Sequence, residues 1–465
     1  MKKVLTILQL FVAVNVAAQM NPGDVFSSPV ITLGEGTFTL PKNFSQDFGS
    51  ADVVITGVPG KTIITDNSPP PLLLDVTLPD LNSDGIYVVY RNPYYAFGGG
   101  FAHLQLPYNT AGLPCLYTQG TILQKCNGVW SRYYTGYGFK TTGNITCTGI
   151  TFSGCSFYIF SPFGKIETQK FELSNCVFEN VARVVSSVTL GNSEQEMPFN
   201  SLQVYDVYGG FRFSEFKIQS CVFDNIYTSI VWGIPPSRSI TVRDNYIANC
   251  PTTVAFFTCY MKKYKLDGSG SDEEYWVNKV NCTFEGNLFE RIMQNNNWTV
   301  SLIRTCGKAN VSYNVFDSVS PQITLFYGGN STFTNNFVRK INTPTETQSC
   351  VVLIKTLDTP VNTIADNEVY APCSPFVAVE GYSSFFINKN KGEVLTVFNK
   401  QGEADAPNQF VRIANNDLKA KWVTVISSRD SAVRFGFVET MGNNFTGLDA
   451  KPYIGRTKVL NYIHL

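Results

Sequence analysis

The chain has 465 residues, a formal net charge of zero, 15% charged residues and 14% aromatic residues. Its 36 basic and 36 acidic residues exclude the strongly basic balance that is typical of nucleic-acid-binding proteins. We therefore expect no nucleic-acid partner and no strong net field that would steer a polyanion to the protein.

The first residues have the pattern of a secretory signal peptide, which we place at residues 1–18. Lys2 and Lys3 precede an apolar run that begins at Val4, and small residues at Ala17 and Ala18 favour cleavage after Ala18. The apolar run is too short to span a membrane, and no later stretch reaches roughly 18 uninterrupted apolar residues. We expect a secreted, extracellular protein without a membrane span, in which residues 19–465 form a single domain.

Short β-runs broken by glycine and proline follow this leader, at Val30–Leu33, Val53–Thr56 and Thr62–Thr65. Residues 66–145 lack this pattern and are rich in tyrosine, glycine and proline, which indicates an elaborated coil or an inserted hairpin region.

From residue 147 onward, one short motif returns at irregular intervals. It consists of Asn or Cys, any residue, and an aromatic or aliphatic residue, and no segment shows helical periodicity. Returns of about 20 to 30 residues are typical of stacked coils in a solenoid. The motif begins at Cys155, Cys176, Cys221, Asn245, Asn287, Asn314, Asn335, Asn367, Asn416 and Asn443.

Two intervals between motifs are too long for one coil. Their polar, turn-rich segments near 187–210 and 260–277 predict loops that leave one face of the solenoid.

Equivalent residues of neighbouring parallel coils lie about 4.8 Å apart. An asparagine at a sharp turn can then bond both its own backbone and the amide of the next asparagine. We predict that the motif asparagines stack into a ladder and that the aromatic or aliphatic residue two positions later points into the core. This use of the asparagines is structural.

The twelve cysteines include no paired CxxC, which disfavours a zinc site, whereas disulfides are expected in an oxidising compartment. Cys115 and Cys126 flank a short loop and are the predicted disulfide pair. Cys155, Cys176 and Cys221 share one motif position, which indicates stacked, buried thiols as the alternative for them. Seven sequons predict N-glycosylation in a eukaryotic secretory pathway, at Asn43, Asn144, Asn281, Asn297, Asn310, Asn330 and Asn444.

The pattern resembles the right-handed parallel β-helix of the pectin-lyase-like superfamily. Locally it is similar to polysaccharide lyase family six, the alginate lyase and chondroitinase B type. The residues that carry this resemblance are Val300–Thr305, the turn Asn314-Val-Phe316 and Ile323–Gly328. The resemblance implies an all-β, right-handed parallel β-helix with loop insertions.

Four positions depart from that family. Its catalytic lysine aligns with Arg304, its catalytic arginine with Phe326, its following histidine with Tyr327, and its calcium-binding carboxylate with a position near Thr299. A lyase needs a base and a cation that stabilises the enolate-like intermediate. Arginine stays protonated and phenylalanine serves neither purpose, so the family mechanism does not transfer unchanged.

The stacking of the coils gives a second, independent way to predict a binding site. The residues that follow the apolar strands form one outward polar stripe, in which Arg304, Tyr327, Lys355 and Glu380 are the predicted binding residues. If the protein is a lyase, then Arg304, Tyr327 and Lys355 are its catalytic residues. The stripe also includes Thr258, Asn399 and Ser427.

A second column lies just after the core aromatic residues. It contains Glu179, Asp224, Glu290 and Asp317, and we expect Glu290 and Asp317 one coil apart. Such a pair suits acids at turns, or alternatively a calcium site or an acid–base pair. Unless this pair binds calcium, we expect no cofactor and no metal.

Three functions remain open. The first is a secreted, non-catalytic β-helix glycoprotein of an extracellular matrix, wall or coat that binds polysaccharide or matrix components. The second is an active lyase that cleaves a uronic-acid polysaccharide by β-elimination. The third is an adhesin or attachment protein. The sequence therefore leaves open whether the protein is an enzyme.

Overall fold

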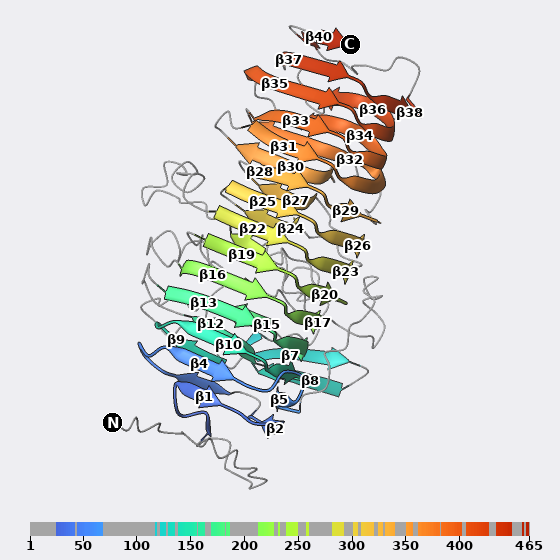
Figure 1. Ribbon diagram of the computed structural model, residues 1–465. Helices are drawn as coiled ribbons and strands as arrows, with labels where there is room; N and C mark the ends of the chain where they lie inside the picture. Colours follow the sequence, from blue (N-terminus) through green and yellow to red (C-terminus); the bar gives the residue numbers. More distant parts are fainter. Residues whose placement is uncertain are drawn as a thin grey trace, which may run out of the picture.

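The protein is a right-handed parallel β-helix, as predicted, in which each coil adds strands to the same sheets in chain order (Figure 1). This computed structural model describes the chain between residues 25 and 464 with gaps, of which the longest are 68–116, 187–212 and 260–280.

The first sheet is a 15-stranded parallel sheet along one side of the solenoid. Its inward side chains are apolar and its outward ones are mostly polar, which is the alternation expected for strands with one covered face. Its strands are β1 (Val30–Thr32), β4 (Val53–Thr56), β10 (Ile145–Thr148), β13 (Gln169–Ser174), β16 (Phe213–Gln219), β19 (Ser239–Arg243), β22 (Asn281–Glu285), β25 (Lys308–Ser312), β28 (Ser331–Thr334), β31 (Val361–Ala365), β33 (Ser384–Asn388), β35 (Ala406–Ala414), β37 (Arg434–Met441), β39 (Lys458–Val459) and β40 (Tyr462–His464).

A 22-stranded sheet completes the coils and consists of two parallel ladders that merge. The second ladder contains β2 (Gly36–Thr39), β5 (Thr62–Thr65), β11 (Thr151–Ser153), β14 (Val177–Val181), β17 (Val222–Ile226), β20 (Tyr246–Ala248), β23 (Leu288–Ile292), β26 (Val315–Val319), β29 (Phe337–Val338) and β38 (Asn444–Thr446). The third ladder contains β3 (Ser45–Asp47), β9 (Gly138–Thr141), β12 (Tyr158–Pro162), β15 (Arg183–Ser186), β18 (Val231–Trp232), β21 (Phe257–Cys259), β24 (Ser301–Thr305), β27 (Thr324–Gly328) and β30 (Cys350–Thr356).

The two ladders merge because three long strands run through both of them. The long strands are β32 (Glu368–Gly381), β34 (Lys391–Gln401) and β36 (Asp417–Ile426). The first of these strands, β32, begins at Glu368, which pairs with β29, and its later residue Val377 pairs with β30.

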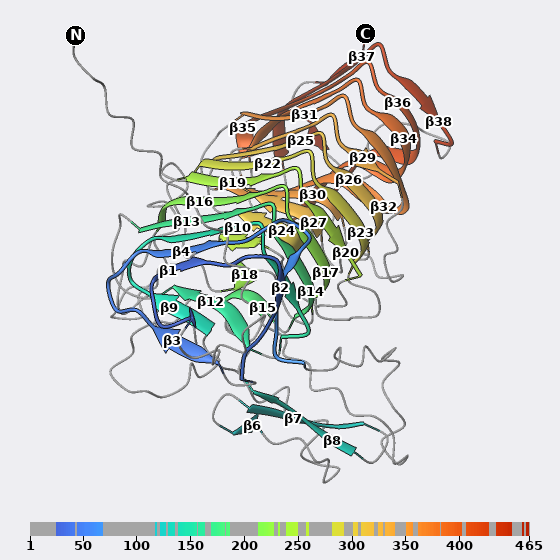
Figure 2. The ribbon, with the colours of Figure 1, turned by 60° about the horizontal axis from the view of Figure 1, so that its bottom comes forward.

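The region predicted to be irregular, 66–145, contains an antiparallel three-stranded sheet that lies apart from the stack of coils (Figure 2). It consists of β6 (Tyr117–Thr118), β7 (Thr121–Cys126) and β8 (Val129–Tyr134). The parallel coils resume at Gly138, inside that range, because β9 pairs with β3 and β12. The predicted leader at 1–18, both predicted loops and the side chains of Cys115 and Cys126 lie outside the described residues.

Stacked phenylalanines fill the core, as the motif predicted. The rings of Phe152, Phe178 and Phe223 lie on three successive coils with centroids 5.2 and 5.1 Å apart and planes only 5° from parallel. The rings of Phe289 and Phe316 repeat this arrangement at 4.9 Å. All five side chains are fully buried, and Ile247 and Val338 fill the same column on other coils, so the column forms one continuous core.

A ladder of buried asparagines locks the corner between the first sheet and the second ladder. In Asn287, Oδ1 accepts from the backbone N and Nδ2 of Asn245, while Nδ2 donates to Oδ1 of Asn314 and to the Val242 carbonyl at 2.9 Å. Both donors and both acceptor positions of the amide are therefore used. The ladder residues are Asn245, Asn287, Asn314, Asn336, Asn367, Asn390, Asn416 and Asn443.

The prediction was wrong by one residue at Asn335. Val315 pairs with Phe337, so Asn336 occupies the ladder position and is 2% exposed. Asn335 is exposed and adopts a left-handed conformation with φ of 55°, which asparagine tolerates better than most residues.

Two further positions were misassigned. Asn390 belongs to the ladder but was missed because its motif ends in Gly392, where a Cβ would lie 1.9 Å from the Val369 carbonyl oxygen. Cys155 does not share a column with Cys176 and Cys221. Ser153 pairs with Glu179, which puts Cys155 two residues later at the level of the buried Val181.

The Asn336→Ala substitution should destabilise the protein by at least about 3 kcal/mol. It leaves Asn314 without its acceptor and the buried Val311 carbonyl without its donor. Chemical denaturation of the purified protein measures this loss. The matched control is Asn335→Gly, which keeps the left-handed turn and should change the free energy of unfolding by only a few tenths of a kcal/mol. Equal losses in both variants would contradict the assigned register.

Candidate functional site

Two parallel rows of side chains cover the outer face of the second ladder. They arise because alternate residues of each strand point outward and in-register pairing stacks them coil on coil. We call them the apolar row and the charged row. The apolar row is Val177, Val222, Tyr246, Leu288, Val315 and Phe337. The charged row is Glu179, Asp224, Ala248, Glu290, Asp317 and Arg339.

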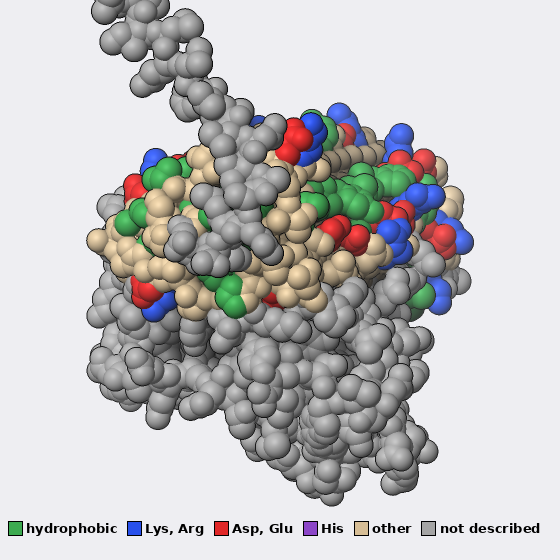
Figure 3. All heavy atoms as spheres, turned by 90° about the horizontal axis from the view of Figure 1, so that it is seen from below, with side chains coloured by type: hydrophobic (Ala, Val, Ile, Leu, Met, Phe, Trp, Pro, Cys, Tyr) green, Lys and Arg blue, Asp and Glu red, His purple; other side chains and the backbone are tan. Residues whose placement is uncertain are grey.

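Each member of the apolar row is only partly buried, although its neighbours on either side in the strand are fully buried. Six coils at this spacing span about 24 Å. The row ends at Phe337, whose ring packs edge-on against Tyr370 at a centroid distance of 6.5 Å. In the view along the solenoid, a strip of hydrophobic side chains runs beside a mixture of acidic and basic ones (Figure 3).

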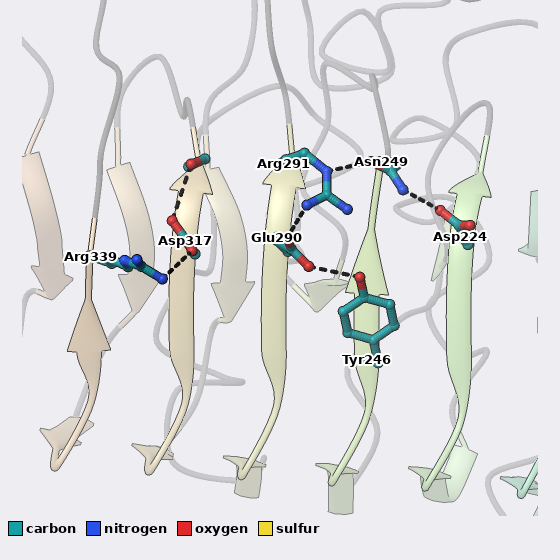
Figure 4. A network of polar contacts seen from close by, with 8 residues as sticks. Asp224, Tyr246, Asn249, Glu290, Arg291, Asp317 and Arg339 are labelled. Atoms are coloured by element: carbon teal, nitrogen blue, oxygen red, sulfur yellow. Dashed lines mark hydrogen bonds and ion pairs between the residues drawn. The ribbon is translucent and has the colours of Figure 1, made fainter.

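A hydrogen-bonded network joins three coils of the charged row (Figure 4). Asn249 Nδ2 donates to Asp224 at 2.7 Å, and Arg291 Nε donates to Asn249 Oδ1 at 2.7 Å. Arg291 also pairs with Glu290, which accepts from the Tyr246 hydroxyl at 2.7 Å. The small Ala248 occupies the row between the two acids, and Asn249 and Tyr246 bridge that level.

The next acid in the row has its own partners. Asp317 accepts from the Ser318 hydroxyl at 3.1 Å and pairs with Arg339 at 3.2 Å (Figure 4). The charged row therefore carries two hydrogen-bonded groups, one from Asp224 to Glu290 and one around Asp317, in which carboxylates, amides and guanidinium groups orient one another.

Glu290 and Asp317 are paired in register one coil apart, as expected. Each of them already contacts an arginine. Among the residues that the structure describes, no group of three or more His, Cys, Asp or Glu side chains is placed to hold a metal ion. The geometry favours an ordered polar surface at this pair over a metal centre.

The predicted stripe runs along the third ladder, and its register differs from the expected one. Arg304 pairs with Tyr327 on the next coil, but Tyr327 pairs with Leu353. Lys355 pairs with Glu380 and lies two residues further along its strand. This displaces Lys355 and Glu380 by about 7 Å from the level of Arg304 and Tyr327. The side chains of these four predicted residues lie outside the described part of the structure.

The outer face of the merged strands continues this stripe and is covered. Ala378 and Asn399 lie level with Leu353 and are 0% and 6% exposed. Phe376 and Val397, two residues earlier on the same face, are fully buried. Of the residues in the expected stripe, Asn399 is therefore closed to solvent.

Three of the predicted glycosylation asparagines lie on or next to the first sheet. Asn281 and Asn310 are exposed and lie on β22 and β25, while Asn144 immediately precedes β10. Asn444 is exposed at the start of β38. The remaining three, Asn43, Asn297 and Asn330, lie outside the described residues.

Sequence reasoning missed five residues that belong to the charged row or bond to it, namely Tyr246, Asn249, Arg291, Ser318 and Arg339. Three of them carry a recognisable signal: Asn249 and Arg291 follow the charged row directly and adopt left-handed conformations with φ of 51°. Ser318 does the same at 56°. A polar residue after each charged-row position therefore marks a second turn of the coil.

Comparison with known proteins found no matching family model and no curated protein or solved structure with significant similarity. Within the described ranges, no helix is long and apolar enough to cross a membrane.

Calcium should not stabilise the protein through Glu290 and Asp317, because arginines already neutralise both carboxylates. We expect thermal unfolding in millimolar Ca²⁺ to shift by the same amount in the wild type and in the Glu290→Gln/Asp317→Asn variant. A stabilisation of the wild type that the variant lacks would instead identify this pair as a calcium site.

Proposed function

We propose that this chain is a secreted, non-catalytic β-helix protein of an extracellular matrix, wall or coat that binds an extended, uncharged polysaccharide along the apolar and charged rows. The observation that carries the proposal is the side-by-side course of the two rows over successive coils. A partly exposed apolar surface beside fixed hydrogen-bonding groups suits a ligand that is apolar on one side and rich in hydroxyl groups on the other.

The repeat of the rows supports a polymer rather than a small molecule. Each coil presents a similar pair of outward side chains at intervals of about 4.8 Å. A chain of repeating sugar units can contact several coils at once, and linked contacts raise the affinity well above that of one contact. The network of Asp224, Asn249, Arg291 and Glu290 orients its groups in advance, which lowers the entropic cost of binding.

The charge of the rows supports an uncharged polymer. The charged row includes four carboxylates, two of which pair with the cations Arg291 and Arg339. A uronan would place its own carboxylates against this acidic excess, and like charges at close range are unfavourable.

The resemblance to polysaccharide lyase family six supplies an alternative. A uronan lyase would use Arg304, Tyr327 and Lys355, and the direct pairing of Arg304 with Tyr327 is the observation in its favour. The register offset of Lys355 and the four departures from the family motif weigh against it.

Export and glycosylation belong to the same proposal. The signal-like leader and the seven sequons support them. The exposed Asn281 and Asn310 lie on the first sheet, away from the two rows, so that glycans there would leave the rows accessible.

Binding should depend on the apolar row. We expect the purified protein to bind an uncharged polysaccharide such as a β-glucan, xylan or mannan, with an affinity that rises with oligosaccharide length up to the span of the row. Leu288→Ser and Phe337→Ser should each weaken binding about tenfold, because each removes apolar contact area. Isothermal titration calorimetry against a length series measures both effects.

The matched control is Val361→Ser, which removes an exposed apolar side chain (44% exposed) from the first sheet. It should leave the affinity unchanged. Equal losses in all three variants, or no binding to any uncharged polysaccharide, would contradict the proposal. Formation of unsaturated ends from alginate, pectate or chondroitin, abolished by Tyr327→Phe, would support the lyase instead.

A further inference from the structure

Three buried cysteines gather where the first sheet turns into the second ladder. Cys147 lies on β10, and its thiol sulfur is 3.7 Å from that of Cys176 on the next coil. The thiol of Cys176 also contacts the Cys147 carbonyl at 3.5 Å and the Ser174 carbonyl at 3.3 Å. Cys221 occupies the position of Cys176 one coil further on, since Val177 pairs with Val222. All three side chains are at most 1% exposed.

These cysteines stand where the asparagine ladder ends. The backbone N of Cys221 donates to Asn245 Oδ1 at 2.9 Å, which is the last bond of the ladder on this side. A thiol offers one weak donor and a weak acceptor, so Cys176 and Cys221 cannot interlock neighbouring coils as the amides do. The coils that carry Cys147 and Cys176 therefore lack the amide contacts that join the later coils, whereas the coil of Cys221 is joined to Asn245 on one side only.

We propose that Cys147 and Cys176 form a disulfide that ties two neighbouring coils together where the ladder stops. The proposal rests on the export of the chain to an oxidising compartment, which is part of the proposed function. The sulfur separation must fall from 3.7 Å to about 2.0 Å, the length of a disulfide bond. The bond would close a loop between residues 29 positions apart, and such closure stabilises a fold by restricting its unfolded chain.

The oxidant is a small-molecule or protein disulfide. The Cys176 thiolate attacks one sulfur of that disulfide and releases the other sulfur as a thiolate. The Cys147 thiolate then attacks the Cys176 sulfur of the mixed disulfide and releases the second thiolate. The two cysteines lose two electrons and two protons, and the oxidant becomes two thiols. Because both thiols are buried in the finished fold, the exchange takes place as the coils assemble.

Cys155 provides the matched comparison. It is equally buried, but its sulfur contacts the carbonyl oxygens of Ile64 at 3.6 Å and Ser153 at 3.8 Å. Burial raises its pKa well above the usual range. It should therefore stay a thiol under conditions that oxidise Cys176.

Peptide mapping tests the proposal. The full chain is reduced, unfolded and refolded in a buffer of reduced and oxidised glutathione. Its free thiols are then alkylated under denaturing conditions before digestion and mass spectrometry. We expect a linked peptide pair that contains Cys147 and Cys176, with Cys155 and Cys221 alkylated. Full alkylation of Cys147 and Cys176, or a bond between Cys176 and Cys221, would overturn the proposal.

Thermal unfolding with and without reductant provides a second measurement on the same protein. Reductant should lower the midpoint by several degrees more in Cys155→Ala than in Cys147→Ala, because only the former retains the bond. An equal effect of reductant in both variants would overturn the proposal. Refolding in glutathione requires neither export nor a glycan ligand, so failure here and failure of the proposed function give separate results.

Discussion

The asparagine ladder is the interaction on which the rest of the structure depends. Each amide inside it joins three successive coils, and every polar atom of the amide is used. Because the ladder is buried, a slip of one residue would leave several donors and acceptors without partners, each at a cost of about 1–3 kcal/mol. The ladder thus fixes the register of the corner and, through it, that of the strands on both sides.

The side chains on the outer surface follow the same register. The apolar row and the charged row exist because the residues one and three positions after each ladder asparagine stack over successive coils. Where the ladder gives way to cysteine, at Cys176 and Cys221, the rows continue but the polar lock does not. The covalent tie and the polysaccharide-binding surface that we propose would therefore both depend on one corner geometry.

Much of the fold could be predicted from the sequence because the ladder leaves a local signal. The motif Asn-x-Phe at Asn287 and Asn314 identifies both the corner and the core residue. The motif fails to identify the correct ladder asparagine at two places. Asn335 and Asn336 are adjacent, and only the pairing of Val315 with Phe337 decides between them. In the motif that begins at Asn390, Gly392 stands in place of the aromatic residue, because the Val369 carbonyl oxygen leaves no room for a Cβ.

The candidate site was harder to predict because it depends on contacts between coils. Counting from the apolar strands put Lys355 level with Tyr327, yet the pairing of Tyr327 with Leu353 moves it two residues away. Residues such as Asn249 and Arg291 have no motif of their own and become partners only once neighbouring coils are in register. A single sequence gives the approximate length of a coil but not these shifts.

Native-state hydrogen exchange at the ladder asparagines tests the central claim most directly. Their backbone amides, from Asn245 to Asn416, each donate to the next asparagine of the ladder. If the ladder fixes the register, these amides should be among the slowest to exchange in the protein, and they should lose protection together with the amides of the first sheet. Rapid exchange at the ladder while the first sheet stays protected would show that the corners open independently, and it would contradict the account.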